Sequence, residues 1–226
     1  VKLHGSLGGS PVQLLVCLIY GAETEAPKEP ELELFRLAFA GALEQKAGIV
    51  AEVTAMSQTR GVQNCAPTGR DYVDEALDMP SRGTLRYRQP FGSFSNPNPH
   101  IAIATAEWLL EAVRRDVNAD SGGEPCTDLL ELYCGAGSHT LALAPLFRHV
   151  LAVEINRHLV VAAQHNVIAN GLSNVTVVRA PSEEFCKRVV RKRSYELRGE
   201  AAGGGPPIQL NFGCTVVDPP RAGLDP

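Results

Sequence analysis

The segment DLLELYCGAGSHTLALA, from Asp128 to Ala144, is the most informative part of this chain for its fold class. Its first part, DLLEL, is an apolar run typical of a buried strand, and the apolar residues of HTLALA recur at helical spacing. Between them, Gly135 and Gly137 permit a tight turn and the close approach of a ligand that a Cβ atom would block. A strand, a glycine-rich bend and a helix in this order are typical of nucleotide-binding proteins.

The alternation of strand and helix continues toward the C-terminus. The sequence predicts a helix at 100–117, then strands at 149–155, 174–180 and 214–220 with helices at 156–171 and 182–193 between them. Repeated βα units of this length predict a parallel sheet with helices on both faces, the doubly wound (Rossmann-like) α/β class. Such sheets bind ligands beyond the carboxyl ends of their strands.

Glu154 strengthens the nucleotide-binding interpretation of the bend. It ends the next strand, nineteen positions after Gly135, where a carboxylate can accept hydrogen bonds from both hydroxyls of an adenosine ribose. The alternative is an exposed acid at a strand end. Thr140 fills the slot where a dinucleotide fingerprint has its third glycine, which favours an adenosine ligand without phosphate, such as S-adenosylmethionine (SAM).

A second carboxylate is expected in the same crevice. In VVDPPRAGLDP, Asp218 ends the fourth strand and is followed by two prolines that cannot continue the sheet. The functional interpretation places this carboxylate near the reactive methyl group. The alternative is a pair of prolines that only terminates the strand.

The N-terminal residues follow another pattern. Strands are predicted at 11–21, 49–58 and 83–94, with a helix at 31–48 that ends at Gly48. This order predicts an α+β unit on a mostly antiparallel sheet. We therefore expect two domains, over residues 1–92 and 93–226.

Bulk composition excludes several classes of protein. The 226 residues are 44% hydrophobic and 20% charged, with a net charge of −4. No apolar run approaches the roughly 18 residues of a membrane span, so we expect no membrane partner. The six cysteines form no CxxC pair, which predicts reduced thiols and no metal site. We expect an intracellular monomer, cytoplasmic or organellar, that contacts nucleic acid only through local basic patches.

Six motifs resemble those of the tRNA (uracil-5-)-methyltransferases and, more loosely, of their ribosomal-RNA relatives. The resemblance extends from Pro11 to Pro226. The six motifs are YRQPFGSFSNPN, LLELYCGAGSHTLALA, AVEI, NVIANGLSNV, SEEF and VDPPRAGLD. The resemblance implies an enzyme that transfers a methyl group from SAM to C5 of a uridine in the T-loop of tRNA, with residues 1–92 as part of an RNA-facing domain. Two alternatives stay open: the same fold acting on ribosomal RNA, and a non-catalytic module that binds SAM or RNA.

The resemblance also implies a set of cofactor-binding residues. Two of them depart from the family pattern: Asn96 stands where the family usually has a longer Gln, and Ser138 stands where it often has Asn. Both substitutions keep a polar side chain, so we retain the assignments. The implied residues are Asn96, Tyr133, Gly135, Gly137, Ser138, Glu154 and Asp218.

The catalytic residues of the family are expected beyond Pro226. In the family a cysteine thiolate adds to C6 of uracil, C5 then attacks the methyl group, and a glutamate base removes the C5 proton. Neither the Ser-Cys-Asn-Pro turn nor that glutamate occurs here. Because the chain opens on Val1 and stops after a strand and its loop, we expect a fragment truncated after the fourth strand and inactive alone. Cys134, beside the bend, is expected to be a buried wall residue.

A short basic and aromatic stretch is the candidate RNA contact. Arg86, Arg88 and Phe91 interleave cations with an aromatic ring, which suits phosphate contacts and the stacking of an unpaired base. Arg221, after the two prolines, is a further candidate. The alternative is an exposed basic strand without an RNA role.

Overall fold

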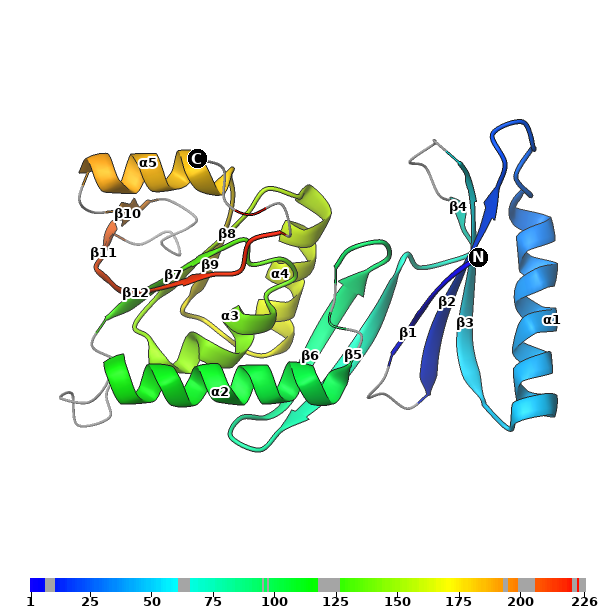
Figure 1. Ribbon diagram of the computed structural model, residues 1–226, viewed down its shortest axis with the longest axis horizontal. Helices are drawn as coiled ribbons and strands as arrows, with labels where there is room; N and C mark the ends of the chain where they lie inside the picture. The colour runs from blue at the N-terminus through cyan, green and yellow to red at the C-terminus, as the bar shows by residue number, and fades with distance from the viewer. Residues whose placement is uncertain are drawn as a thin grey trace. The chain divides into compact units, whose positions relative to one another are not determined.

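Two sheets divide the chain into two units. The computed structural model describes residues 1–6, 11–60, 66–94, 96, 98–117, 127–192, 195–198, 206–220 and 223. The first unit comprises Val1–Leu77 with Arg88–Pro99, and the second comprises Asp78–Tyr87 with His100–Pro226 (Figure 1). The predicted division after residue 92 differs from this one, because residues 78–87 group with the second unit and residues 93–99 with the first.

The first unit is a four-stranded sheet with one helix. Its elements are β1 (Lys2–Gly5), β2 (Val12–Tyr20), α1 (Glu29–Ala47), β3 (Ala51–Thr59) and β4 (Ala66–Pro67), with strand order β1-β2-β3-β4. The outer pairings, β1 with β2 and β3 with β4, are antiparallel, whereas β2 and β3 run parallel along their full length. The expectation of a mostly antiparallel sheet is therefore wrong for the longest strand pair. Helix α1 returns the chain to the end of the sheet where β2 began, so β3 runs in the same direction as β2.

Helix α1 begins at Glu29, two residues before the predicted start, and ends at Gly48 as predicted. Lys28 N donates a hydrogen bond to Glu31 Oε2 at 2.9 Å in the first turn. Gly48 terminates the helix with φ 65°, a left-handed conformation that glycine adopts without strain. The helix packs against β3 and buries Leu32.

The second unit contains the predicted parallel sheet. Its helices and sheet strands are α2 (Pro99–Val117), β7 (Asp128–Leu132), α3 (Ser138–Leu143), a 3₁₀ turn (Ala144–Leu146), β8 (Val150–Glu154), α4 (Arg157–Ala169), β9 (Val175–Arg179), α5 (Ser182–Lys192) and β12 (Phe212–Val217). The strand order is β12-β7-β8-β9, and all three pairings are parallel. This arrangement confirms the doubly wound α/β class.

Both faces of the second sheet are covered, so its central strands are buried throughout. On one face, Leu130 and Leu151 pack with Phe185 of α5 in an apolar cluster. Side chains alternate between the faces of a strand, so Glu131 points to the opposite face, where Thr140 of α3 meets it. Figure 1 shows α5 and α3 on opposite sides of this sheet.

Two hairpins were not predicted. Strand β5 (Tyr72–Met79) pairs with β6 (Gly83–Pro90), and β10 (Tyr195–Leu197) pairs antiparallel with β11 (Ile208–Leu210). The acidic residues of YVDEALDM obscure the alternation of β5, in which even Glu75 is buried. The end of the β5–β6 hairpin groups with the second unit because Tyr87, 5% exposed, donates a hydrogen bond to Ser138 O at 3.4 Å.

Candidate functional site

In the bend after β7, every second residue from Tyr133 to Gly137 has a left-handed backbone conformation. Tyr133, Gly135 and Gly137 have φ angles of 59°, 58° and 89°. Tyr133 is the only non-glycine residue with positive φ among the described residues, and such a conformation is strained for a bulky side chain. Its hydroxyl donates a hydrogen bond to the Glu183 carboxylate of α5. The tyrosine therefore ties the bend to the start of the SEEF helix.

Glu154 lies directly against this bend. Gly135 N donates to Glu154 Oε2 at 3.0 Å, and Asn156 N donates to Glu154 Oε1 at 2.8 Å. A carboxylate has about four acceptor sites, so about two remain after these bonds. That number suits the two hydroxyls of a ribose. The sequence-based pairing of the bend with this acid is present in the structure, although the ribose contact itself stays a prediction.

The space around Gly135 is compatible with a ligand. A Cβ atom built on Gly135 would meet no atom within 4 Å, whereas one on Gly137 would lie 3.7 Å from Ala163 and from Thr140. The inner glycine therefore faces the packed helices, and Gly135 faces open space. Glu154 already accepts the hydrogen bond from Gly135 N, so this N–H is not available to a phosphate. The bend therefore has fewer free donors for a phosphate than a dinucleotide-binding turn has. The residues present fit a nucleoside better than a pyrophosphate.

Glu131, which sequence reasoning missed, is a buried acid beneath the bend. It is 1% exposed, and Thr140 Oγ1 donates to its Oε2 at 2.5 Å. Burial raises the pKa of Glu131 to about 8; the hydrogen bond from Thr140 opposes this shift, and the negative charge of Asp218 adds to it. An acid inside an apolar strand was the sequence feature that could have identified it. Thr140 is thus both the residue that replaces a third glycine and the partner of this acid.

Asp218 follows β12 and lies beside the first turn of α3. Its Oδ2 is 3.5 Å from His139 Nε2, and its side chain is 64% exposed. The same carboxylate acts electrostatically on Glu131. The structure therefore brings Asp218 to the bend, and it adds His139 as a neighbour that the sequence did not predict.

Cys134 is buried, as predicted. It is 6% exposed, and burial raises the pKa of its thiol well above the usual value, with the charges of Glu131 and Glu154 acting in the same direction. A thiol held in its protonated form is a poor nucleophile. The burial of Cys134 is therefore confirmed, and its place in the wall of a cofactor site stays a prediction.

Ser138 and Asn96 lie in different units. Ser138 is the first residue of α3, is exposed, and accepts the hydrogen bond from Tyr87 through its carbonyl. Asn96 belongs to the first unit, where its exposed side chain accepts a hydrogen bond from Asn98 N at 3.1 Å. Cofactor contacts by both residues stay predictions.

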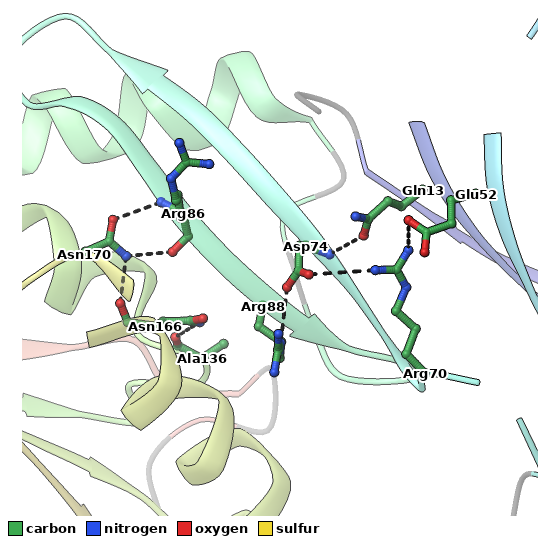
Figure 2. Close-up of polar contacts among 9 residues, drawn as sticks. All are labelled: Gln13, Glu52, Arg70, Asp74, Arg86, Arg88, Ala136, Asn166 and Asn170. Atoms are coloured by element: carbon green, nitrogen blue, oxygen red, sulfur yellow. Dashed lines mark hydrogen bonds and ion pairs between the residues drawn. The ribbon is translucent and has the colours of Figure 1, made fainter. Parts of the chain in front are cut away.

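The candidate RNA residues differ in their surroundings. Arg86 is exposed, whereas the Arg88 guanidinium lies 3.8 Å from the centre of the Tyr72 ring and donates through Nε to Asp74 (Figure 2). Phe91 packs against the apolar cluster of the first unit. RNA contacts by these three residues stay predictions, and both Arg88 and Phe91 also have structural partners.

Arg221 lies outside the described residues. Within the part of the chain that the structure describes, no helix combines the length and apolarity that a membrane crossing requires. No group of three or more His, Cys, Asp or Glu side chains within the same part is arranged to hold a metal ion.

Comparison with known proteins gives consistent matches. The family model of tRNA (uracil-5-)-methyltransferases matches residues 14–226. The tRNA/tmRNA (uracil-C(5))-methyltransferase of Azotobacter vinelandii is 40% identical over 175 residues, which are 77% of this chain and 44% of that protein. Its counterpart in Ectopseudomonas mendocina is 38% identical over 185 residues, covering 82% of this chain and 47% of that protein.

One solved structure supports the fold. The tRNA (uracil-54, C5)-methyltransferase of Pyrococcus abyssi, in complex with S-adenosyl-L-homocysteine, superposes with a TM-score of 0.54 at 17% identity and covers 97% of this chain and 43% of that one. The chain spans less than half the length of these curated relatives and of this structure.

Proposed function

Because the chain belongs to the tRNA (uracil-5-)-methyltransferase family, we propose that it takes part in transferring a methyl group from SAM to C5 of a uridine in tRNA. The second unit supplies the SAM site at the bend after β7. The T-loop of tRNA is the proposed location of the target uridine. The family model and relatives named for tRNA and tmRNA favour tRNA over the ribosomal-RNA alternative.

One observation carries the proposal: Glu154 and the left-handed bend are joined by the hydrogen bond from Gly135 N. The acid is held in place by Asn156 N as well, so it needs no reorganisation to receive a ribose. Open space beside Gly135 provides room for the nucleoside. Together these features form a sugar-binding corner at the carboxyl end of the sheet.

The charge of the site supports a cationic cofactor. Glu154 and Asp218 are carboxylates at or beside the bend. Their negative potential attracts the sulfonium and amino groups of SAM and repels a pyrophosphate. When bound, SAM supplies the methyl group. The chain's own residues bind the nucleoside, orient it and shield it from water.

The chain does not contain the family's Ser-Cys-Asn-Pro turn, and Cys134 is unsuited to act as the nucleophile. In the proposed reaction, a cysteine thiolate adds to C6 of uracil, and C5 then attacks the methyl group of SAM, with S-adenosylhomocysteine as the leaving group. A base removes the C5 proton, and the thiolate is eliminated from C6 so that the C5=C6 double bond forms again. We therefore propose that the 226 residues bind cofactor and RNA without methylating by themselves. Incubation with unmodified tRNA and radiolabelled SAM, followed by nucleoside analysis, is expected to give no 5-methyluridine. Formation of 5-methyluridine by the chain alone would contradict this division of roles.

Calorimetric titration with S-adenosylhomocysteine (SAH) tests the cofactor site. Glu154→Ala is expected to weaken SAH binding about 10- to 100-fold, because a charged hydrogen-bond acceptor is lost. Glu111→Ala removes an exposed acid from α2 of the same unit and is the control. NAD, which carries a pyrophosphate, is expected to compete more weakly than SAH by at least about 10-fold. Equal SAH affinities in the Glu154→Ala and unaltered chains would refute the ribose assignment.

A further inference from the structure

The side chain of Asn170 binds the backbone of β6 as a neighbouring strand would. Arg86 N donates to Asn170 Oδ1 at 3.0 Å, and Asn170 Nδ2 donates to Arg86 O at 2.7 Å. Both backbone groups of Arg86 on this edge are therefore paired by one amide (Figure 2). Pairing both groups of one residue fixes the strand along its own axis as well as across it, because a shift by one residue would break both bonds.

Asn170 is itself held by the helix that it ends. It follows the last residue of α4, and its Nδ2 also donates to Asn166 O at 2.7 Å. An amide nitrogen has two hydrogens, and here both are used, one for Arg86 and one for α4. Gly171 follows with φ 66° and completes the helix terminus. The amide therefore has one orientation that satisfies all its partners.

Asn166 connects the same helix to the cofactor bend. It lies one turn before Asn170, is 0% exposed, and its Nδ2 donates to Ala136 O at 2.9 Å. Ala136 stands between Gly135 and Gly137, in a backbone segment that no strand pairs. The buried amide of Asn166 therefore joins α4 to the bend through a backbone carbonyl.

We propose that Asn166 and Asn170 are positioning residues that hold Arg86 of β6 in fixed register with the cofactor bend. The path runs from Ala136 O through Asn166 and Asn170 to the backbone of Arg86, entirely within the second unit. Figure 2 shows the Arg86 side chain extending away from Asn170, so the clamp leaves its guanidinium available to a ligand. The RNA part of this proposal rests on the proposed function, because it takes Arg86 as a phosphate contact.

Amide hydrogen exchange tests the clamp without any ligand. In Asn170→Ala the Arg86 N–H is expected to exchange at least about 10-fold faster, because its acceptor is gone. Asn174→Ala is the matched control: this asparagine also binds backbone carbonyls through Nδ2, at 2.8 Å from Ala144 O and 2.9 Å from Phe147 O, but it does not contact β6. Unchanged Arg86 exchange in Asn170→Ala would overturn the proposal.

A double-mutant cycle tests the positioning role. Binding of an unmodified tRNA transcript is measured for Asn170→Ala, Arg86→Ala, the double variant and Asn174→Ala. Asn170→Ala is expected to weaken RNA binding about 5- to 30-fold, with little further loss in the double variant, because Asn170 acts through Arg86. SAH affinity is expected to stay within about twofold in Asn170→Ala and to fall at least about fivefold in Asn166→Ala, which releases the bend.

These measurements distinguish a failure of the positioning proposal from a failure of the RNA role of Arg86. If Arg86→Ala lowers RNA affinity and Asn170→Ala does not, or if their effects simply add, the positioning proposal is overturned. If Arg86→Ala leaves RNA affinity unchanged, the RNA role assigned to Arg86 under the proposed function is refuted. In that case faster Arg86 exchange in Asn170→Ala, together with weaker SAH binding in Asn166→Ala, still supports the clamp between β6 and the bend.

Discussion

Two β-α-β segments of this chain have the same parallel topology but differ at the carboxyl ends of their strands. In the first unit, β2, α1 and β3 form a parallel pair around a helix, and in the second unit β7, α3 and β8 do the same. Residues 21–28 lead from β2 to α1, and β3 ends at Thr59. The second segment instead has a bend with three left-handed residues, and β8 ends at Glu154.

The helices of the two segments also differ, both in length and in burial. Helix α1 has 19 residues, of which Leu32 is buried, whereas α3 has six residues, of which four are buried. The parallel pairing of β7 with β8 places the bend beside the end of the neighbouring strand, where Cys134 N donates to Val153 O at 3.1 Å. A parallel β-α-β connection is therefore common to both units and does not distinguish the candidate site. The bend and the acid at the end of the second strand are what distinguish the candidate site.

The largest expected effect concerns Glu131, whose carboxyl group titrates inside the second segment. Its pKa is about 8 in the fold and 4.5 as the ordinary value. The folded chain therefore holds a proton that the unfolded chain has lost between these two pH values, so stability falls as the pH rises from about 4.5 to about 8. Glu131→Gln removes this loss. We expect the variant to be more stable than the unaltered chain by about 4 kcal/mol at pH 8 and by less than about 1 kcal/mol at pH 5.

Urea unfolding at the two pH values, followed by far-UV circular dichroism that reports on both units, measures this difference. The control lies in the first segment: Ser57 of β3 is 4% exposed and donates through Oγ to Pro27 O at 3.1 Å. Ser57→Ala is expected to cost about 1 kcal/mol at both pH values, since a hydroxyl does not titrate there. A pH-independent effect of Glu131→Gln would show that Glu131 is ionised in the fold.

The next effect separates backbone strain from ligand contact. Gly135 and Gly48 have φ of 58° and 65°, and a Cβ atom on either would meet nothing within 4 Å. Gly135→Ala and Gly48→Ala are therefore expected to destabilise the chain similarly, by about 1 kcal/mol. Only Gly135→Ala is expected to weaken SAH binding, by at least about 10-fold, because its methyl group enters the proposed ligand space. Calorimetry that found equal SAH affinity in both variants would place the ligand elsewhere.

The smallest effect tests the link between the bend and α5. The hydrogen bond from Tyr133 lowers the pKa of Glu183. In Tyr133→Phe the pKa of Glu183 is expected to rise toward its ordinary value, as measured by NMR titration of the side chain. Tyr20→Phe, at the end of β2 in the first segment, is the matched control and is expected to leave the pKa of Glu183 unchanged. An unshifted Glu183 in Tyr133→Phe would mean that another group holds this carboxylate.

Much of the fold followed from pattern alone. Periodicity predicted β7, β8, β9, β12 and the helices between them, and Gly48 marked the end of α1. Strands whose pattern is interrupted by charge were missed. Strand β5 buries Glu75 within YVDEALDM, where the neighbouring acidic residues hide the apolar alternation that would mark a strand.

Pattern along the chain was enough to predict the doubly wound class and the pairing of the glycine bend with Glu154, because both follow from the order and period of residues along one segment. The left-handed conformation of Tyr133, the burial that raises the pKa of Glu131 and the pairing of Asn170 with Arg86 became evident in the folded structure alone. Each of these depends on groups far apart in the chain. Burial, desolvation and amide pairing arise only when the folded backbone brings such groups together.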